Sequence, residues 1–465
     1  MEVRRFRRNK LVGVVIAFGF AWISCQHDPQ RELLTDEDYI QSAYFSGGTT
    51  TVFDASPSAF TKPLNNLSPE NLQRFLQGEA IFKGDFNNVV NSPFYGLGPQ
   101  FIESSCVNCH VGNGRGALSS ISHQGLLLRI SMQGTDGFGA PLEVPYFGTQ
   151  LQTNSINNSP AEGAMDVLWE YQPVVFPDGY SVVLKQPYFS ISNPYHPLPE
   201  FYLRGGRHAA PIFGLGLLEA VPIATLESIA DEPDQNEDGI SGKLNYVMDF
   251  QVNELRPGLF GWKSSSPGIL QQTADAFHQD MGITSPIFPL ENCNNQSNCQ
   301  GVQEGIDIEG DLLSDVVFYL RTLAPPARRN LEDPLVQLGG QLFEELKCDK
   351  CHIPELQTGI HPIAELSFQT IRPYTDMLLH ELGPGLGDGR PDYLAGANEW
   401  RTPPLWGIGL TKTVFPNAGF LHDGRAETIE EAILWHEGEA IFSKQSYLEL
   451  SSSQREALLR FLESL

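Results

Sequence analysis

The spacing of apolar residues along the chain predicts four amphipathic helices. They are expected at residues 68–86, 310–324, 333–352 and 451–465. The first opens with Ser68, a residue type that caps helices, and then places apolar side chains three or four positions apart, which buries one face. Runs of β-branched and aromatic residues between turn formers predict strands at 125–132 and 180–191. The pattern therefore predicts a mainly α fold with β insertions.

The chain begins with a pattern typical of export. Four arginines and a lysine stand within the first ten residues, and the apolar run that follows is too short and too one-sided for a transmembrane helix. This run stops at Cys25, so we interpret residues 1–24 as a lipoprotein-type signal peptide and Cys25 as the lipidated residue. A plain secretory signal with an incidental cysteine is the alternative. Both interpretations predict a bacterial periplasmic protein. A lipid anchor would be its link to a membrane, and the polar residues 25–66 a flexible tether.

Length and charge narrow the choice of partners. A chain of 465 residues is expected to form two or three domains. Lys and Arg number 30 against 56 Asp and Glu, a net charge of −26, and without residues 1–24 the balance is 25 against 55, or −30. Nucleic acid is therefore a poor partner, because its binding needs a basic surface. A basic protein or a small cationic electron donor suits this charge better.

The chain also contains an internal repeat. The segment HAAPIFGLGLLEA at 208–220 resembles RTPPLWGIGLTKT at 401–413, and each copy follows one C-x-x-C-H motif. The simplest explanation is two related units, each built around its own motif.

The C-x-x-C-H motifs indicate covalent haem. They comprise Cys106, Cys109 and His110 in the first copy and Cys348, Cys351 and His352 in the second. A redox-active thiol pair needs no histidine at this position. A zinc knuckle needs a second ligand pair at short spacing, whereas 242 residues separate the two histidines. In c-type haem proteins the two thiols add to the porphyrin vinyl groups and the histidine binds iron. We therefore predict two covalently bound haem c groups.

Each iron then needs a sixth ligand or an open position. For the second haem, His436 lies fourteen residues after His422 on a predicted helix, and His436 is the preferred ligand. The candidates for the first haem are His123, Met132, His208 and Met281, and none is convincing. The repeat after the first motif has no histidine that matches His436 and carries Glu219 instead. A carboxylate beside an open iron would move protons during O–O cleavage, and the alternative is a helix-start or surface glutamate.

Two further groups of residues have simple chemical interpretations. Asp234, Asn236 and Asp238 have the alternate spacing of the first half of an EF-hand calcium loop, although the twelfth position is Asn245 instead of glutamate. The alternative is an acidic turn without a metal. Cys293 and Cys299 are predicted to form a disulfide outside the cytoplasm, with two free thiols as the alternative.

Taken together, residues 68–465 resemble the di-haem oxidoreductases, a family sometimes labelled thiol-oxidoreductase-like. This family is related to bacterial di-haem cytochrome c peroxidases and to the methylamine-utilisation di-haem enzyme. The motifs that carry the resemblance are CVNCHVGNGRG, PIFGLGLLEAVP, DQNEDGISGKLN, FGWKSSSPGILQQTADAFHQDMGITSP, RPYTDMLLHELGPGLGDG, EWRTPPLWGIGL and FLHDGRAETIEEAILWHEGEA. The resemblance implies two cytochrome-c-like haem domains in tandem, an N-terminal one at 67–325 with an insert and a C-terminal one at 326–465.

The resemblance also implies a function. In the peroxidase relatives the C-terminal haem stores an electron and the N-terminal haem meets peroxide. There a methionine stands where this chain has His436, and two imidazoles would lower the potential of the iron. We therefore expect an exported, peroxidase-like oxidoreductase with His110 and His352 as proximal ligands, Glu219 as acid/base, a small-molecule oxidant and an external donor protein. Two alternatives are a non-catalytic electron-transfer cytochrome and a metal-handling lipoprotein. The family's thiol label has no support in this sequence, because every cysteine already has another predicted role.

Overall fold

The computed structural model describes residues 42–465 with the exception of 90, 118–123, 157 and 301–304. The predicted signal peptide at 1–24 and the predicted lipidation site Cys25 lie outside the described residues. Within the described part of the chain, no helix is both long and apolar enough to cross a membrane.

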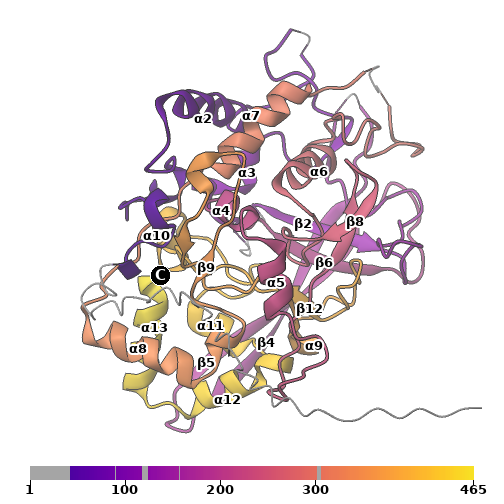
Figure 1. Cartoon of the computed structure of the whole chain (residues 1–465). Coiled ribbons are helices and arrows are strands. Elements are labelled where there is room, and N and C mark those ends of the chain that lie inside the picture. The colour runs from indigo at the N-terminus through magenta and orange to yellow at the C-terminus, as the bar shows by residue number, and fades with distance from the viewer. Residues whose placement is uncertain (1–41, 90, 118–123, 157, 301–304) are drawn as a thin grey trace, which may run out of the picture.

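Two pairs of packed helices lie at opposite ends of the molecule (Figure 1). In the first pair α2 (Pro69–Phe82) packs against α7 (Gly310–Arg321), and in the second α8 (Pro334–Glu345) packs against α13 (Ser452–Ser464). These are the four helices that the apolar spacing predicts. The Ser68 side chain caps α2 as expected, because it accepts a hydrogen bond from a backbone amide of the first turn.

Glycine allows the two helices of each pair to touch backbone to backbone. A Cβ atom added to Gly78 of α2 would lie 2.1 Å from the carbonyl oxygen of Asp315 in α7. A Cβ atom on Gly339 of α8 would lie 2.0 Å from the carbonyl oxygen of Ala457 in α13. The same packing solution therefore occurs in both units.

The two repeat segments pack against each other. Gly214 and Gly407 have φ values of 71° and 72°, a conformation that glycine adopts without strain. A Cβ atom on Gly214 would lie 2.4 Å from the Trp406 ring, and one on Gly407 would lie 2.6 Å from the Phe213 ring. Because each repeat contacts the same position of the other, the units meet about an approximate two-fold axis.

Eight further helices and six two-stranded sheets complete the described chain. The remaining helices are α3 (Cys106–Cys109), α4 (Leu215–Glu219), α5 (Ile223–Ile229), α6 (Ile269–Met281), α9 (Gly383–Leu386), α10 (Thr411–Val414), α11 (Ile429–Leu434) and α12 (Ile441–Glu449). The strands are β1 (Gln100–Phe101), β2 (Leu126–Ser131), β3 (Asn154–Ser155), β4 (Ala164–Val175), β5 (Ser181–Ser192), β6 (Leu203–His208), β7 (Tyr246–Asp249), β8 (Glu254–Pro257), β9 (Leu356–Gln357), β10 (Thr370–Ile371), β11 (Leu379–Glu381) and β12 (Glu399–Arg401). They pair antiparallel as β1–β3, β2–β6, β4–β5, β7–β8, β9–β10 and β11–β12.

The prediction of a mainly α fold made of two cytochrome-c-like domains in tandem is wrong. Helices hold 31% and strands 19% of the residues, and the strands form many small sheets, so the structure is not predominantly helical in the way of cytochrome c. The long β4–β5 hairpin accounts for much of the difference. Half-buried and exposed residues alternate along most of β4, which is the period of a strand, yet the sequence analysis recognised only its partner β5.

The apolar cores do not follow the predicted boundary at 325/326. The largest core packs α2, α4, α6 and α7 and takes in Met377 and Trp406 from the C-terminal part. A second core packs α8, α11 and α13 and takes in Phe176 and Leu184 from the β4–β5 hairpin. A third and smaller core lies between β2 and residues 144–151. Side chains therefore cross the boundary in both directions.

The prediction of a flexible tether is wrong for residues 42–66. Phe60 is 1% exposed and stacks on Phe213 with 4.2 Å between the ring centroids. Val52 forms a β-bridge with Pro326, and Pro63 forms one with Leu323. The polar composition of residues 42–66 gave no sign of this packing. The buried Phe60 ring holds the segment against the rest of the protein.

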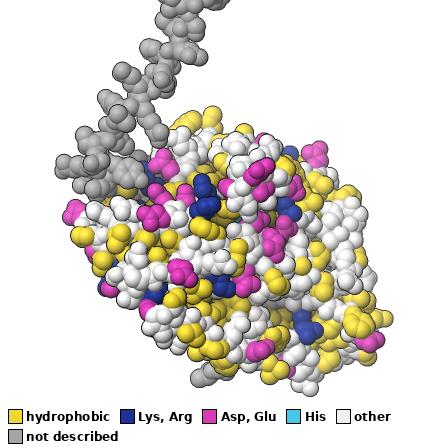
Figure 2. Space-filling view, turned by 90° about the horizontal axis from the view of Figure 1, so that it is seen from below, with side chains coloured by type: hydrophobic (Ala, Val, Ile, Leu, Met, Phe, Trp, Pro, Cys, Tyr) yellow, Lys and Arg dark blue, Asp and Glu magenta, His cyan; other side chains and the backbone are white. Residues whose placement is uncertain are grey.

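Charges on the surface are dispersed. On the face that Figure 2 shows, acidic and basic side chains stand scattered among apolar and uncharged ones. The chain has 56 acidic against 30 basic residues, so its excess charge is negative. Such a surface attracts a cationic partner more readily than an anionic one.

We expect Gly78→Ala to lower the free energy of unfolding by about 1–3 kcal/mol, because the added methyl group would overlap the backbone of α7. The matched control is Gly310→Ala, where an added Cβ meets nothing within 4 Å. The control should be neutral or slightly stabilising, because alanine favours a helix. Denaturant unfolding followed by circular dichroism measures both changes. Equal stability of the two variants would refute the close helix contact.

Candidate functional site

The first C-x-x-C-H motif forms one helical turn that aims its histidine. The His110 amide donates to the Cys106 carbonyl oxygen over 2.9 Å at the end of α3. The His110 ring donates from Nδ1 to the Ala210 carbonyl oxygen over 2.8 Å, which leaves Nε2 available. Burial lowers the pKa of His110, so the ring is neutral at pH 7. A neutral imidazole held by a carbonyl is the form that binds iron.

The second motif repeats this arrangement. The His352 amide donates to the Cys348 carbonyl oxygen over 3.0 Å, and His352 Nδ1 donates to the Tyr374 carbonyl oxygen over 3.0 Å. Burial lowers the pKa of His352 to about 4. A phenylalanine lies 6.4 Å from each histidine between ring centroids, Phe82 in the first unit and Phe343 in the second.

The thiols of the motifs are unsuited to redox exchange. All four cysteines are unbonded in the structure. Burial, with a smaller contribution from Asp280, raises the pKa of Cys106 to about 12, and burial raises the pKa of Cys348 to about 12. A redox-active cysteine pair instead has a thiol whose pKa is lowered, so that the thiolate forms near neutral pH. The burial of these thiols therefore disfavours the redox alternative.

One cluster of possible metal ligands occurs in the described part of the chain. It consists of Cys351, Asp376 and His380, whose ligand atoms lie within 4.8 Å of one another. Both ring nitrogens of His380 are already engaged, Nε2 with Asp376 at 2.7 Å and Nδ1 with Glu439 at 2.6 Å. His380 therefore has no free nitrogen for a metal.

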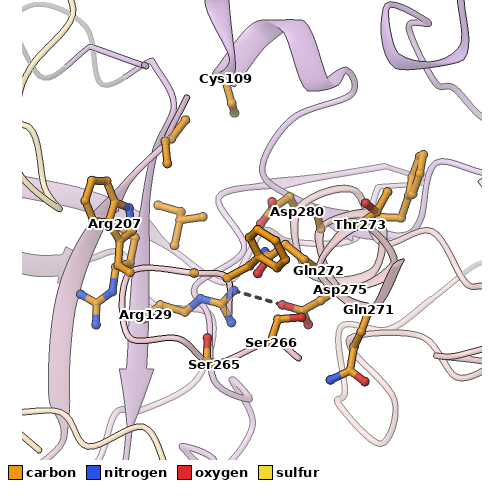
Figure 3. Close-up of a pocket in the computed structure, with 18 of the residues that line it drawn as sticks. Cys109, Arg129, Arg207, Ser265, Ser266, Gln271, Gln272, Thr273, Asp275 and Asp280 are labelled. Carbon is orange, nitrogen blue, oxygen red and sulfur yellow. Dashed lines mark hydrogen bonds and ion pairs between the residues drawn. The ribbon is translucent and has the colours of Figure 1, made fainter. Parts of the chain in front are cut away.

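A cavity of about 650 Å³ lies beside the first motif. Its walls come from α3, β2, β6, α6 and the turn at 260–266. Apolar side chains include Phe82, Leu126, Ile212, Phe277 and Met281, and cationic ones include Arg129, Arg207, Lys263, Arg390 and Arg401. Figure 3 shows Cys109 at one end and Ser265 toward the other, with the Arg129–Asp275 ion pair of 3.4 Å between them. A flat apolar ring that carries carboxylates fits such a lining, so the residues present fit a haem.

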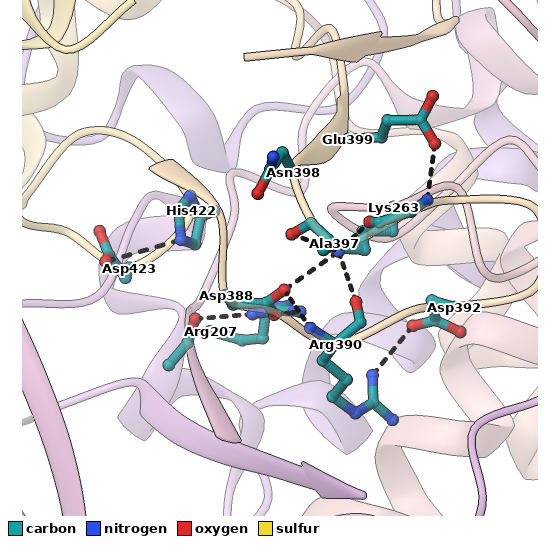
Figure 4. Close-up of polar contacts among 12 residues, drawn as sticks. Arg207, Lys263, Asp388, Arg390, Asp392, Ala397, Asn398, Glu399, His422 and Asp423 are labelled. Atoms are coloured by element: carbon teal, nitrogen blue, oxygen red, sulfur yellow. Dashed lines mark hydrogen bonds and ion pairs between the residues drawn. The ribbon is translucent and has the colours of Figure 1, made fainter. Parts of the chain in front are cut away.

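A buried ion network forms part of the cavity wall (Figure 4). Lys263 is 1% exposed and donates to Asp388 over 3.1 Å and to the carbonyl oxygens of Arg390 and Gly396 over 2.7 Å each. Arg207 pairs with the other oxygen of Asp388. Burial lowers the pKa of Lys263 to about 8. The network ties the 388–396 loop to β6 and to the 260–266 turn.

The sequence analysis missed this network, although its residues lie in motifs that carry the family resemblance. Lys263 belongs to FGWKSSSPG and Asp388 to GPGLGDG. The signal was therefore present, but nothing in one sequence shows that two motifs 125 residues apart form an ion pair.

The structure distinguishes among the candidate ligands of the first haem by their place relative to the cavity. His208 and Met281 line the cavity beside His110, whereas Met132 does not. His123 lies outside the described residues. The backbone of His208 is fixed on both sides, because its amide donates to the His422 carbonyl oxygen over 2.6 Å and its carbonyl accepts from Trp262 Nε1 over 2.7 Å. Burial, and next to it the charge of Arg115, lowers the pKa of His208 to about 3.

His436 and His422 occupy different surroundings. His436 follows α11 and donates from Nδ1 to the Ala432 carbonyl oxygen over 2.7 Å, as both motif histidines do to their carbonyls. Burial lowers the pKa of His352, and a positive charge on His436 would lower it further. His422 instead stacks on Trp400 with 3.7 Å between centroids.

Glu219 ends α4 and is engaged in structural contacts. It accepts hydrogen bonds from the Ile269 amide over 2.8 Å and from Arg321 Nε over 2.5 Å, and His361 Nε2 lies 3.6 Å away. Burial acts to raise its pKa, but His361 and Arg321 outweigh burial and lower the pKa to about 2. Glu219 is not among the described residues that line the cavity beside Cys106.

The predicted calcium loop is a hydrogen-bonded turn in this structure. Asp234 Oδ1 and Asn236 Oδ1 both accept from the Asp238 amide, over 3.0 and 2.9 Å, and Asp238 Oδ1 accepts from the Ile240 amide over 3.0 Å. Asn245, at the twelfth position, is buried and donates to the carbonyl oxygens of Lys263 and Asp392. It therefore does not close the loop, and calcium binding stays a prediction. Cys293 and Cys299 are joined as a disulfide.

Comparisons with known proteins agree with this geometry. A family model described as "Di-haem oxidoreductase, putative peroxidase" matches residues 39–465. Among solved structures, hydrazine synthase of Kuenenia stuttgartiensis, pressurised with xenon, is 14% identical, with 54% of this chain and 88% of that chain covered. Its TM-score of 0.24 is too low to support an argument about the fold. No curated protein matches. The family predicted from the sequence is thus confirmed, and the chain belongs to the di-haem oxidoreductases.

Proposed function

We propose that the protein is an exported, peroxidase-like oxidoreductase that carries two covalently attached c-type haems. The observation that carries this proposal is the cavity beside the first motif, into which His110 faces with Nδ1 fixed and Nε2 available. A small-molecule oxidant would react in this cavity. An external donor would supply electrons through the second motif.

Haem supplies a reversible one-electron change at its iron and an axial position where an oxidant binds. The chain's own residues supply the remaining requirements. Cys106, Cys109, Cys348 and Cys351 would fix the rings, and His110 and His352 would bind the irons. His436 is the preferred further ligand of the second iron, because its Nδ1 is engaged with the Ala432 carbonyl oxygen, as in both motif histidines.

The structure supports a different proton carrier from the one predicted. Asp280 lines the cavity and accepts a hydrogen bond from Gln150 Nε2 over 2.8 Å. Burial raises the pKa of Asp280 to about 6. A carboxyl group that titrates near neutral pH can both hold and release a proton. We therefore assign proton transfer to Asp280 and a structural role to Glu219, whose low pKa keeps it ionised.

A non-catalytic electron-transfer cytochrome remains the second candidate. The specific observation in its favour is that His208 and Met281 line the same cavity as His110. Either side chain would close the sixth position if it bound the first iron.

Spectroscopy of the purified protein tests the proposed function. We expect two covalent haems by haem staining of a denaturing gel. Electron paramagnetic resonance should show one low-spin and one high-spin ferric centre, with cyanide or peroxide changing only the high-spin centre. Two low-spin centres that ignore both reagents would support the electron-transfer cytochrome, and a chain without covalent haem would sink both candidates.

His436→Ala should convert the low-spin centre to a high-spin one, because it removes an imidazole ligand. The matched control is His422→Ala, which removes the ring stacked on Trp400 and should leave the low-spin signal in place. Visible and paramagnetic resonance spectra of both variants measure the effect. An unchanged spectrum for His436→Ala would rule this ligand out.

Glu219→Gln should lower stability in a pH-dependent way. The folded pKa of about 2 lies below the ordinary 4.5, so the ionised group stabilises the fold by about 3 kcal/mol above pH 4.5, and this contribution is lost as pH falls toward 2. The difference in melting temperature between wild type and variant should therefore be large at pH 7 and narrow at pH 3. Glu79→Gln, at an exposed pair with Lys83, is the control with little effect. A Glu219→Gln variant of normal stability that lost peroxidase turnover would restore the acid/base role.

A further inference from the structure

At the inner end of the first motif loop lies a buried guanidinium with no anionic partner among the described residues. It belongs to Arg115, which is 5% exposed and whose Nε and Nη1 atoms have no hydrogen-bond partner there. Burial lowers the pKa of Arg115 to about 10, so it is a cation at neutral pH. A charge that is buried and unpaired is strongly unfavourable. The loop therefore holds two N–H donors that need an acceptor.

Two other buried arginines pair with carboxylates. Arg390 Nη1 lies 3.2 Å from Asp392, and Arg425 Nη2 lies 2.7 Å from Asp423. A third, Arg401, donates to the carbonyl oxygens of Gly261 and Thr402 instead. The Nε and Nη1 atoms of Arg115 have neither kind of acceptor among the described residues.

His208 is the second unsatisfied group at this place. It is 2% exposed and lines the cavity beside His110, and within the described part of the chain neither ring nitrogen has a hydrogen-bond partner. The Gly116 carbonyl is near enough to affect the His208 ring but does not complete a hydrogen bond with it. The Trp262 indole connects the two groups, because it donates to the His208 carbonyl and lies with its ring 5.7 Å from the Arg115 guanidinium.

We propose that Arg115 and His208 bind one carboxylate of the first haem. This inference rests on the proposed function, since it assumes a haem on Cys106 and Cys109. Arg115 supplies two free N–H groups and a charge, and His208 supplies one N–H group, so a carboxylate satisfies the donors that the protein leaves open. The site faces away from solvent, and a group tethered to the same loop reaches it without a separate binding step.

The position of this carboxylate would be at the contact between the two units. Arg115 also lies 5.9 Å from the Phe420 ring, and the His422 carbonyl holds the His208 amide. Phe420 and His422 follow the second repeat, whereas Arg115 precedes the first and His208 begins it. The carboxylate would therefore orient the first haem with one edge toward the second unit.

The test is the midpoint potential of each haem in Arg115→Gln, measured on the holoprotein by spectroelectrochemistry. Removing a positive charge favours ferric iron, so the ferric-to-ferrous ratio of one haem at a fixed potential should rise about tenfold, or about 59 mV for one electron. Arg115→Lys keeps the charge and should change the ratio much less. Arg455→Gln is the matched control, because Arg455 is buried but pairs with Asp178 away from the cavity. An unchanged potential in Arg115→Gln would overturn the proposal.

Two further experiments identify what Arg115 and His208 bind. His208→Ala should leave the spin state of both irons unchanged, and conversion of a low-spin to a high-spin centre would instead make His208 an iron ligand. The wild-type potential should not respond to added chloride or phosphate. A response that Arg115→Gln abolishes would assign the site to an exchangeable anion. Haem staining before each titration separates failure of this inference from failure of the proposed function.

Discussion

The reciprocal contact of the two repeat segments is the constraint on which the rest of the structure depends. At Gly214 and Gly407 the backbone of one unit touches an aromatic ring of the other, and any side chain there would overlap that ring. The first repeat begins at His208, where β6 ends, and the Ala210 carbonyl in that repeat accepts a hydrogen bond from the His110 ring. The first site is thus tied to the repeat that makes the contact as well as to its own loop.

The sequence predicted the parts of the structure that depend on local signals. The four helices follow from apolar spacing, and the two motifs follow from adjacent cysteines and histidines whose chemistry has few other uses. The burial of Phe60 could not be predicted in the same way, because its partner Phe213 lies far along the chain. The contacts of Glu219 were hidden for the same reason, since Arg321 and His361 come from separate segments. Strand β4 was missed although half-buried and exposed residues alternate along most of it, because a proline interrupts the run.

The buried polar and charged groups of the first site are of two kinds. Asp388 is shared between Arg207 and Lys263. Burial acts to raise the pKa of Asp388, but the charges of Arg207 and Lys263 outweigh burial and keep the carboxylate ionised. This network is complete within the protein and behaves as scaffold. The Nε and Nη1 atoms of Arg115 and both ring nitrogens of His208 lack hydrogen-bond partners among the described residues, which is the reason we propose a carboxylate ligand for them. The difference lies in whether the fold supplies the counter-charge, and it is visible only in three dimensions.

The depth of the cysteines has a consequence for biogenesis. Cys106 packs against the first core and Cys348 against the second, and burial raises the pKa of both thiols to about 12. A thiol reacts as its thiolate, so a chain that has already closed offers poor nucleophiles to a porphyrin. The proposed haem attachment would therefore have to occur while the segments around each motif are still open, with the cores closing afterwards on the attached group. The yield of mature protein would then depend on a competition between the rate of attachment and the rate of collapse, rather than on the stability of the final fold.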